Sequence, residues 1–153
     1  QAAIVEELIE GRELYVGLLG NDQLEVLPIT EMTFGEMEDG ERRIATFKAK
    51  WDEEYRKRKR IRNVFARGLS DQVTAKIGEI CTTAFHALWL LDYGRIDLRL
   101  THDDEVYVIE VNPNPFLAYE HEMANAAEKA GMGYNDFIQR IVDEAMARGD
   151  AAA

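Results

Sequence analysis

The chain has 153 residues, 46% of them apolar, so it can bury one core of ordinary size and we expect a single domain. Its 29 acidic and 18 basic residues give a formal charge of −11, which repels nucleic acid and anionic membranes. The single cysteine, Cys81, excludes an internal disulfide and favours a reducing compartment. The sequence has no apolar run of roughly 20 residues and no signal segment, so we expect a cytoplasmic protein that binds neither nucleic acid nor membranes.

The first 63 residues are predicted to contain mostly strands. Apolar runs separated by Gly-containing turns predict an antiparallel meander with strands at 3–9, 13–19 and 24–27. The segment 30–43 is polar and contains glycine. Residues 44–51 have the composition of a further short strand, and the highly charged segment 51–63 is expected to be irregular.

The second part of the chain is predicted to contain a helix, a β-hairpin and two more helices. Ser70 is a good N-cap, and apolar residues follow it at spacings of three and four as far as Leu91, where the cluster 88–91 is expected to be core. Alternating runs then predict a hairpin, and helical patterns follow, so the remaining elements are expected at 95–100, 105–112, about 120–130 and 134–148. This order predicts an α+β domain with a mainly antiparallel sheet packed with helices, followed by a tail at 149–153.

The predicted hairpin carries a polar face. Side chains alternate along a strand, so Arg95 and Asp97 share one face of its first strand, and Glu110 and Asn112 share one face of its second. Two carboxylates and a carboxamide offer the oxygen ligands that suit Mg²⁺, and Arg95 would stabilise phosphate or oxyanion charge. Two prolines in the segment 112–115 restrict the chain after the second strand and favour a defined site there.

The register of the hairpin determines whether these two pairs meet. An even number of loop residues places odd positions of the first strand opposite even positions of the second, so that all four side chains converge. An odd loop, or a bulge, would separate them. The alternative is a structural ion pair between Arg95 and Asp97 or Glu110 on a solvated face of the sheet.

Three blocks of the sequence together resemble the ATP-grasp family, specifically the C-terminal part of D-alanine–D-alanine ligase-like enzymes. The blocks are EELIEGRE at 6–13, FKAKW at 47–51, and the pair Arg95-Ile-Asp97 with Glu110-Val-Asn112. They occur in the family's order. The resemblance implies an ATP-grasp C-terminal subdomain over 1–148, with the family's lid subdomain and N-terminal domain upstream and absent from this chain.

The resemblance also implies how a nucleotide would bind. Glu6 and the backbone of Glu7 and Ile9 would contact the adenine of ATP. Glu13 would contact the ribose hydroxyls, and Lys50, before an aromatic residue, would contact the triphosphate.

A second set of implied roles concerns metal and chemistry. Asp97 and Glu110 would bind one magnesium ion, and Glu110 and Asn112 a second, with manganese as an alternative metal. Arg95 and Lys50 would act as catalytic residues that stabilise phosphoryl and acyl oxygens.

The implied activity is an ATP-dependent carboxylate–amine ligase with an acyl phosphate intermediate, whose partners are ATP and small carboxylate and amine substrates. Family members that join two D-alanines continue after the asparagine with a Gly- and Ser-containing loop that helps to hold the substrates. Here the residues at 113–117 are PNPFL, so the carboxylate and the amine stay unassigned. The oligomeric state is also open, with a homodimer as one option.

Two other functions are open at this point. The chain could be a nucleotide-binding or interaction module without chemistry of its own. The basic run at 56–62, RKRKRIR, could contact nucleic acid, although a solvated loop is the simpler interpretation in so acidic a chain.

Overall fold

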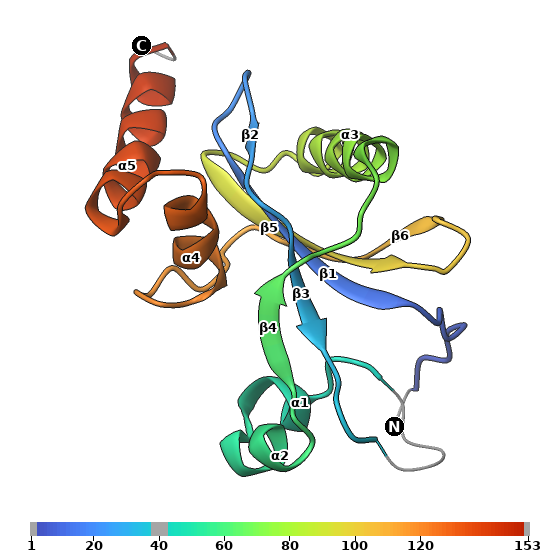
Figure 1. The fold of residues 1–153 in the computed structure, drawn as a ribbon. Helices are drawn as coiled ribbons and strands as arrows, with labels where there is room; N and C mark the ends of the chain where they lie inside the picture. Colours follow the sequence, from blue (N-terminus) through green and yellow to red (C-terminus); the bar gives the residue numbers. More distant parts are fainter. Residues whose placement is uncertain (1–2, 38–42, 152–153) are drawn as a thin grey trace.

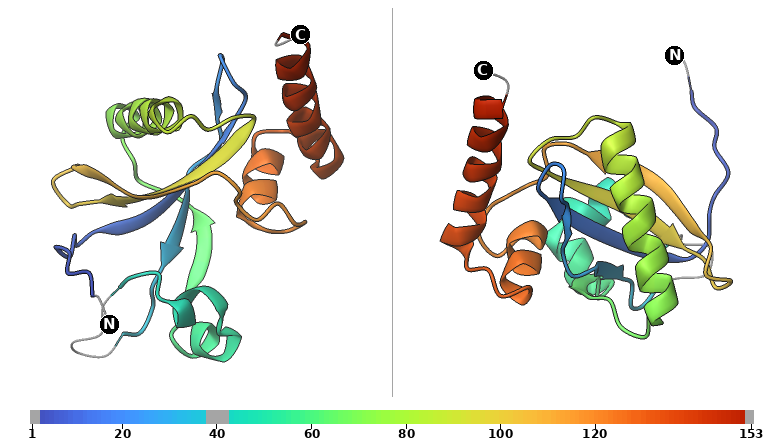
Figure 2. Two further views of the ribbon diagram at one scale, coloured as in Figure 1. Left: turned by 180° about the vertical axis from the view of Figure 1, so that it is seen from behind. Right: turned by 90° about the horizontal axis from the view of Figure 1, so that it is seen from above.

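The computed structural model describes residues 3–37 and 43–151, which form an antiparallel sheet with helices on both faces (Figures 1 and 2). The strand order is β4-β3-β1-β5-β6, and β2 pairs with β1 off this path. These strands span Arg12–Leu19 (β1), Glu25–Val26 (β2), Thr30–Thr33 (β3), Arg62–Phe65 (β4), Tyr93–Leu100 (β5) and Val106–Asn112 (β6). The helices span Phe47–Trp51 (α1), Glu53–Arg58 (α2), Asp71–Ala87 (α3), Glu122–Lys129 (α4) and Tyr134–Ala151 (α5). The predicted α+β class is confirmed.

Helix α3 covers one face of the sheet (Figure 2). The predicted N-cap is correct, because the Ser70 hydroxyl accepts a hydrogen bond from the backbone N–H of Val73 at 3.2 Å. The buried side of α3 packs against even-numbered positions of β1 and β5, and the fully buried members of this core include Leu14, Val16, Leu18, Ile77, Cys81, Phe85, Ile96 and Leu98. Since side chains alternate along a strand, the odd-numbered positions of β1 and β5 point to the opposite face.

The opposite face is covered by two separate groups of helices. Helices α1 and α2 lie together near β3 and β4, and α4 and α5 lie at one end of the sheet (Figure 1). Ala49 of α1 packs in a small core with Tyr15 and Met32, while Met123 of α4 and Phe137 of α5 pack in another. The polar odd-numbered residues of β5 therefore lie between these groups. None of the helices in the described part of the chain is long and apolar enough to cross a membrane.

The N-terminal segment differs from the prediction. Residues 3–9 form no strand, and Ile4 and Val5 are 88% and 94% exposed. Within the described residues the segment pairs with no strand, so the apolar run that suggested a strand has no ladder to join. The strand predicted at 13–19 is confirmed, and 24–27 contains only the short β2.

The segment 44–63 also differs, because it contains two short capped helices instead of a strand and a loop. The Thr46 hydroxyl accepts from the N–H of Ala49 at the start of α1, and the Asp52 carboxylate accepts from the N–H of Tyr55 at the start of α2. Acidic residues begin α2 and basic residues end it, as the helix dipole favours. The capping residues and the charge pattern are visible in the sequence, but the high charge of residues 51–63 led to the prediction of an irregular segment.

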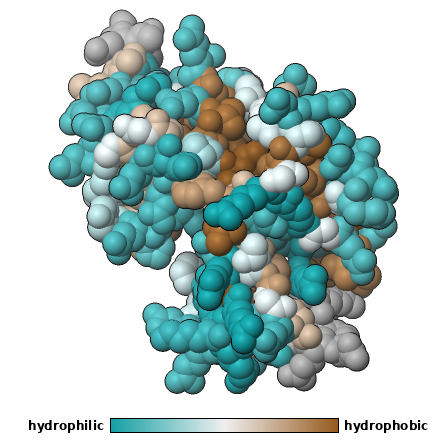
Figure 3. Space-filling view, viewed as in Figure 1, coloured by the Kyte–Doolittle hydropathy of each residue, from teal (hydrophilic) through white to brown (hydrophobic). Residues whose placement is uncertain are grey.

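The basic run at 56–62 thus lies on α2, in the following turn and at the start of β4. Hydrophilic side chains cover the part of the surface where α2 lies (Figure 3). Arg60 pairs with Glu36 at 2.8 Å, and Lys57 lies 4.0 Å from Glu53. Part of the basic charge is therefore already neutralised within the chain.

Two boundaries near the helices were predicted incorrectly. Helix α3 ends at Ala87, and of the cluster 88–91 only Leu90 is buried, whereas Trp89 is 88% exposed with a φ of 57°. Helix α5 continues to Ala151, so residues 149–151 belong to the helix and not to a tail.

Candidate functional site

The β5–β6 hairpin has a different loop from the one predicted. Leu100 lies opposite Val106 at the end of the hairpin, so the loop 101–105 has an odd number of residues. An odd loop alone would place the two polar pairs on opposite faces of the sheet.

A bulge between Asp97 and Leu98 restores the alignment. It shifts the register by one residue, so that Arg95 lies opposite Asn112 and Asp97 lies opposite Glu110. The odd loop and the bulge cancel. The predicted convergence of the four side chains is therefore observed, but the predicted even loop is wrong.

Arg95 holds Asp97 through two parallel hydrogen bonds. Its Nε donates to Oδ1 at 2.7 Å and its Nη2 donates to Oδ2 at 3.0 Å. Its third nitrogen, Nη1, donates to Oε2 of Glu122 on α4 at 2.9 Å, and the guanidinium lies 5.2 Å from the ring centroid of Tyr15. The ion pair considered as an alternative does form, but Asp97 is only 2% exposed, so the pair is not on a solvated face.

The environment of Asp97 disfavours its negative charge despite this pairing. Burial raises the pKa of the Asp97 carboxyl above its ordinary value, Arg95 and Lys50 oppose that rise, and Glu110 adds to it. The Lys50 Nζ lies 3.8 Å from Oδ2 of Asp97. Burial and neighbouring carboxylates likewise raise the pKa of the Tyr15 hydroxyl. A cation bound beside Asp97 would favour its charged form and oppose the effect of burial.

The oxygen donors of this site fit a magnesium ion that is held jointly with phosphate. Within 3–37 and 43–151 no three His, Cys, Asp or Glu side chains form a metal cluster, so the set consists of two carboxylates and the Asn112 carboxamide. Mg²⁺ commonly takes one or two protein carboxylates and completes its shell with water and substrate phosphate. Asp97 retains acceptor capacity beside Arg95, because an ionised carboxylate has about four lone-pair sites. The Asn112 Oδ1 accepts from the N–H of Asn114 at 3.0 Å, which orients the amide.

The residues predicted to hold nucleotide line one pocket of about 430 Å³. Residues 6–9 form one wall, Lys50 and Glu13 come from α1 and β1, and the hairpin supplies Asp97 and Glu110. Glu6 and Glu7 are exposed, and Ile9 is partly buried. The N-terminal segment therefore lies beside Asp97 and Glu110 although it forms no strand.

Glu13 is held by Arg99, which belongs to the same odd-numbered face of β5. The Arg99 Nη2 lies 2.7 Å from the Glu13 Oε2 as an ion pair, and both residues are buried. The geometry of this contact does not make a hydrogen bond, so Oε2 has no hydrogen-bond partner among the described residues. Burial raises the pKa of Glu13, and the charge of Arg99 opposes that rise.

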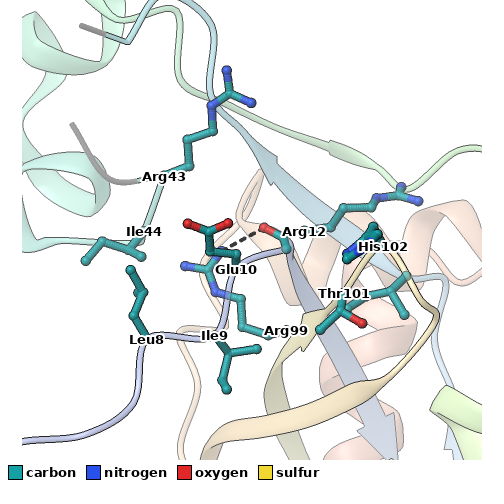
Figure 4. A pocket seen from close by; sticks show the side chains of 11 residues that line it. Leu8, Ile9, Glu10, Arg12, Arg43, Ile44, Arg99, Thr101 and His102 are labelled. Atoms are coloured by element: carbon teal, nitrogen blue, oxygen red, sulfur yellow. Dashed lines mark hydrogen bonds between the residues drawn. The ribbon is translucent and has the colours of Figure 1, made fainter. Parts of the chain in front are cut away.

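Arg99 also lies at the boundary of a second pocket, of about 670 Å³ (Figure 4). Its Nη1 donates to the carbonyl of Gly11 at 2.9 Å, which ties the start of β1 to β5. Leu8 and Ile9 line both this pocket and the pocket of about 430 Å³. The guanidinium thus helps to separate the two spaces.

A third and larger pocket, of about 970 Å³, adjoins the pocket of about 430 Å³ and shares Lys50 and Glu110 with it. Arg95 and Asn112 line this larger pocket. Every predicted site residue therefore lines one of two adjoining pockets that meet at Lys50 and Glu110.

Three residues that support the site were not predicted to do so: Glu122, Asn63 and Arg99. Glu122 accepts hydrogen bonds from the Arg95 guanidinium and from the Asn63 side-chain amide, and Arg99 pairs with Glu13. No local pattern could indicate Glu122, because it lies on a helix far along the chain from Arg95. The alternation of β5 did place Arg99 on the polar face.

Comparisons with known proteins identify the family of the chain. Residues 1–143 match the family described as D-ala D-ala ligase C-terminus. A relative in Sinorhizobium fredii, described as "Uncharacterized protein y4sG", is 34% identical over 97% of this chain and 42% of its own length. The D-alanine–D-alanine ligase of Syntrophobacter fumaroxidans is 29% identical over 94% of this chain and 43% of its own length. The chain thus spans less than half the length of these curated relatives.

Solved structures show the same fold. The D-alanine–D-alanine ligase of Bacillus anthracis in complex with ATP superposes with a TM-score of 0.72 at 19% identity, over 97% of this chain and 42% of that one. The D-alanine–D-alanine ligase of Coxiella burnetii gives a TM-score of 0.74 at 20% identity, over 96% of this chain and 35% of that one. With the family match over residues 1–143, the ATP-grasp resemblance is confirmed, and the chain belongs to the D-ala D-ala ligase C-terminal family.

Proposed function

We propose that this chain is the nucleotide- and magnesium-binding part of an ATP-dependent carboxylate–amine ligase. The observation that carries the proposal is the convergence of Asp97, Glu110 and Asn112 with Arg95 and Lys50 where two pockets meet. Oxygen ligands and fixed cations at one place are what phosphoryl transfer requires, because its catalysis is mainly positioning and charge stabilisation.

The proposed roles follow from position. Asp97, Glu110 and Asn112 would hold two magnesium ions, or manganese, and bound metal would offset charge on the transferred phosphoryl group. Lys50 sits between the two pockets, where it can contact both the triphosphate and the acceptor carboxylate. Arg95 faces the larger pocket and would stabilise acyl oxygens as the acyl phosphate forms and an amine displaces phosphate.

The nucleotide would occupy the pocket of about 430 Å³. Glu6, the backbone of Glu7 and Ile9 would contact the base. Glu13 lines this pocket, and its carboxylate would contact the ribose hydroxyls. Arg99 supports this role by pairing with the same carboxylate.

Calorimetry with ATP and magnesium tests this proposal. We expect ATP binding that requires magnesium and weakens at least roughly tenfold in Glu110→Gln, because one ligand of the metal loses its charge. Glu79→Gln is the matched control, since Glu79 is exposed on α3, on the far face of the sheet. Binding that ignores magnesium, or equal effects of both substitutions, would contradict the proposal.

A second candidate is a nucleotide-binding module without catalysis of its own. It is favoured by the chemistry of the site, because oxygen ligands and fixed cations serve nucleotide binding whether or not a reaction follows. Single-turnover assays for ADP formation separate the candidates, because a binding module would bind Mg–ATP and release no ADP with any carboxylate and amine.

A further inference from the structure

The pocket beside the proposed metal ligands has an aromatic wall that phosphate chemistry does not use. Trp51, at the end of α1, is 62% exposed, and Phe116, in the loop after β6, is 56% exposed. Tyr134, at the start of α5, lines the same pocket of about 970 Å³. Aromatic rings around a concave, partly polar site are typical of small-molecule pockets, where they supply contact area.

Two of the three rings of this wall contact a neighbouring ring. Phe116 contacts His121 edge-on, with ring centroids 4.4 Å apart, and Tyr134 contacts Tyr119 in the same way at 5.5 Å. The two prolines within 113–115 restrict the backbone that carries Phe116. A preorganised wall loses little conformational entropy when a ligand packs against it.

The same pocket also contains partners for a charged head group. Arg95, Lys50, Glu110 and Glu122 line it together with the aromatic rings. A ligand that fits this arrangement has a large apolar side chain and a carboxylate or an amine. A methyl side chain would leave most of the aromatic surface uncovered.

We propose that one substrate of the reaction carries an aromatic or large aliphatic side chain, which packs against Trp51, Phe116 and Tyr134. The term substrate rests on the proposed function. The apolar recognition itself does not require nucleotide, so the two can be tested separately.

The experiment uses Trp51 as the reporter. The chain has two tryptophans, and Trp89 lies outside this pocket and is 88% exposed, so Trp89→Phe leaves a single tryptophan in the wall. This variant is titrated with two phenyl probes, 3-phenylpropionate and 2-phenylethylamine, and with their short counterparts, propionate and ethylamine. The carboxylate and amine pairs show which head group the pocket accepts.

We expect one phenyl probe to bind at least roughly tenfold more tightly than its short counterpart, because each buried methylene in an apolar pocket is worth about that factor. Adding Phe116→Ala should remove this preference, while Tyr107→Ala, an exposed aromatic residue of β6 outside the pocket, should retain it. Circular dichroism checks that both variants fold.

Equal binding of phenyl and short probes would overturn the inference, and so would a phenyl preference that survives Phe116→Ala. A phenyl preference in a chain that fails to bind Mg–ATP would support the apolar pocket and contradict the nucleotide function. Normal Mg–ATP binding without a phenyl preference would support the nucleotide function and contradict the apolar pocket.

Discussion

Asp97 and Glu110 face each other across the hairpin, but replacing each by its amide should have different effects. Both replacements should weaken metal binding, and only the replacement of Asp97 should lower the stability of the fold. Asp97 is buried and receives two hydrogen bonds from Arg95, whereas Glu110 is exposed. Asp97→Asn removes the charge that pairs with a buried guanidinium. Glu110→Gln removes a charge that faces solvent.

The structure sets the size of the difference. Removing one partner of a buried ion pair commonly costs about 3–5 kcal/mol. In Asp97→Asn, Arg95 still donates a hydrogen bond to Glu122 at 2.9 Å and still lies over the Tyr15 ring. Its positive charge therefore still has partners. Neutralising Asp97 also removes the cost of burying its carboxylate. We therefore expect Asp97→Asn to lower the free energy of unfolding by about 2 kcal/mol, and Glu110→Gln to change it by less than about 0.5 kcal/mol.

Urea denaturation without metal, followed by calorimetry with magnesium and ATP, measures both effects. Both variants should lose magnesium-dependent ATP binding, but only Asp97→Asn should unfold at lower urea. For a domain of this size its melting temperature should fall by about 4–8 °C. Equal stability of the two variants would refute the buried ion pair, and unchanged metal binding in Glu110→Gln would refute the metal site.

Three further predictions follow from other contacts. Arg99→Met should destabilise the fold by about 2–4 kcal/mol because it leaves the Glu13 carboxylate buried without its cation. Urea denaturation should show that adding Glu13→Gln recovers part of this loss. A double variant that is less stable than Arg99→Met alone would contradict the pairing. Arg148 lowers the pKa of Asp92 through two hydrogen bonds, so this contact should stabilise the fold above the usual aspartate pKa of about 4 and lose its effect as the pH falls below that value. The difference in stability between wild type and Asp92→Asn, measured from pH 3 to 6, should therefore shrink at the acid end. A difference that stays constant over this range would contradict the prediction. Burial raises the pKa of the Cys81 thiol to about 12, so maleimide should label it only in unfolded protein, and rapid labelling of the native chain would exclude the packed position.

Local sequence pattern determined the elements whose signals do not depend on distant parts of the chain. Ser70 and the spacing of apolar residues after it predicted α3, and strict alternation predicted β5, β6 and their polar face. Those patterns succeed because periodicity of 3.6 or 2 residues directly selects which side chains face a core. The family resemblance then supplied roles that no spacing could provide.

Tertiary structure decided the remainder. The parity of the hairpin depended on a bulge between the Asp97 and Leu98 pairs, where Ile109 of β6 has no partner. This bulge offsets the odd loop, and it is a property of strand pairing that neither strand encodes alone. Residues 3–9 have the composition of a strand but pair with no strand in the described part of the chain, and the charged segment 44–63 forms helices through local caps. Glu122 reaches Arg95 only because α4 packs at the end of the sheet. Within an unbroken strand or helix the sequence by itself determined which residues share a face. Strand pairing and the packing of distant elements determined which of them touch, because contacts between distant residues give no periodic pattern along the chain.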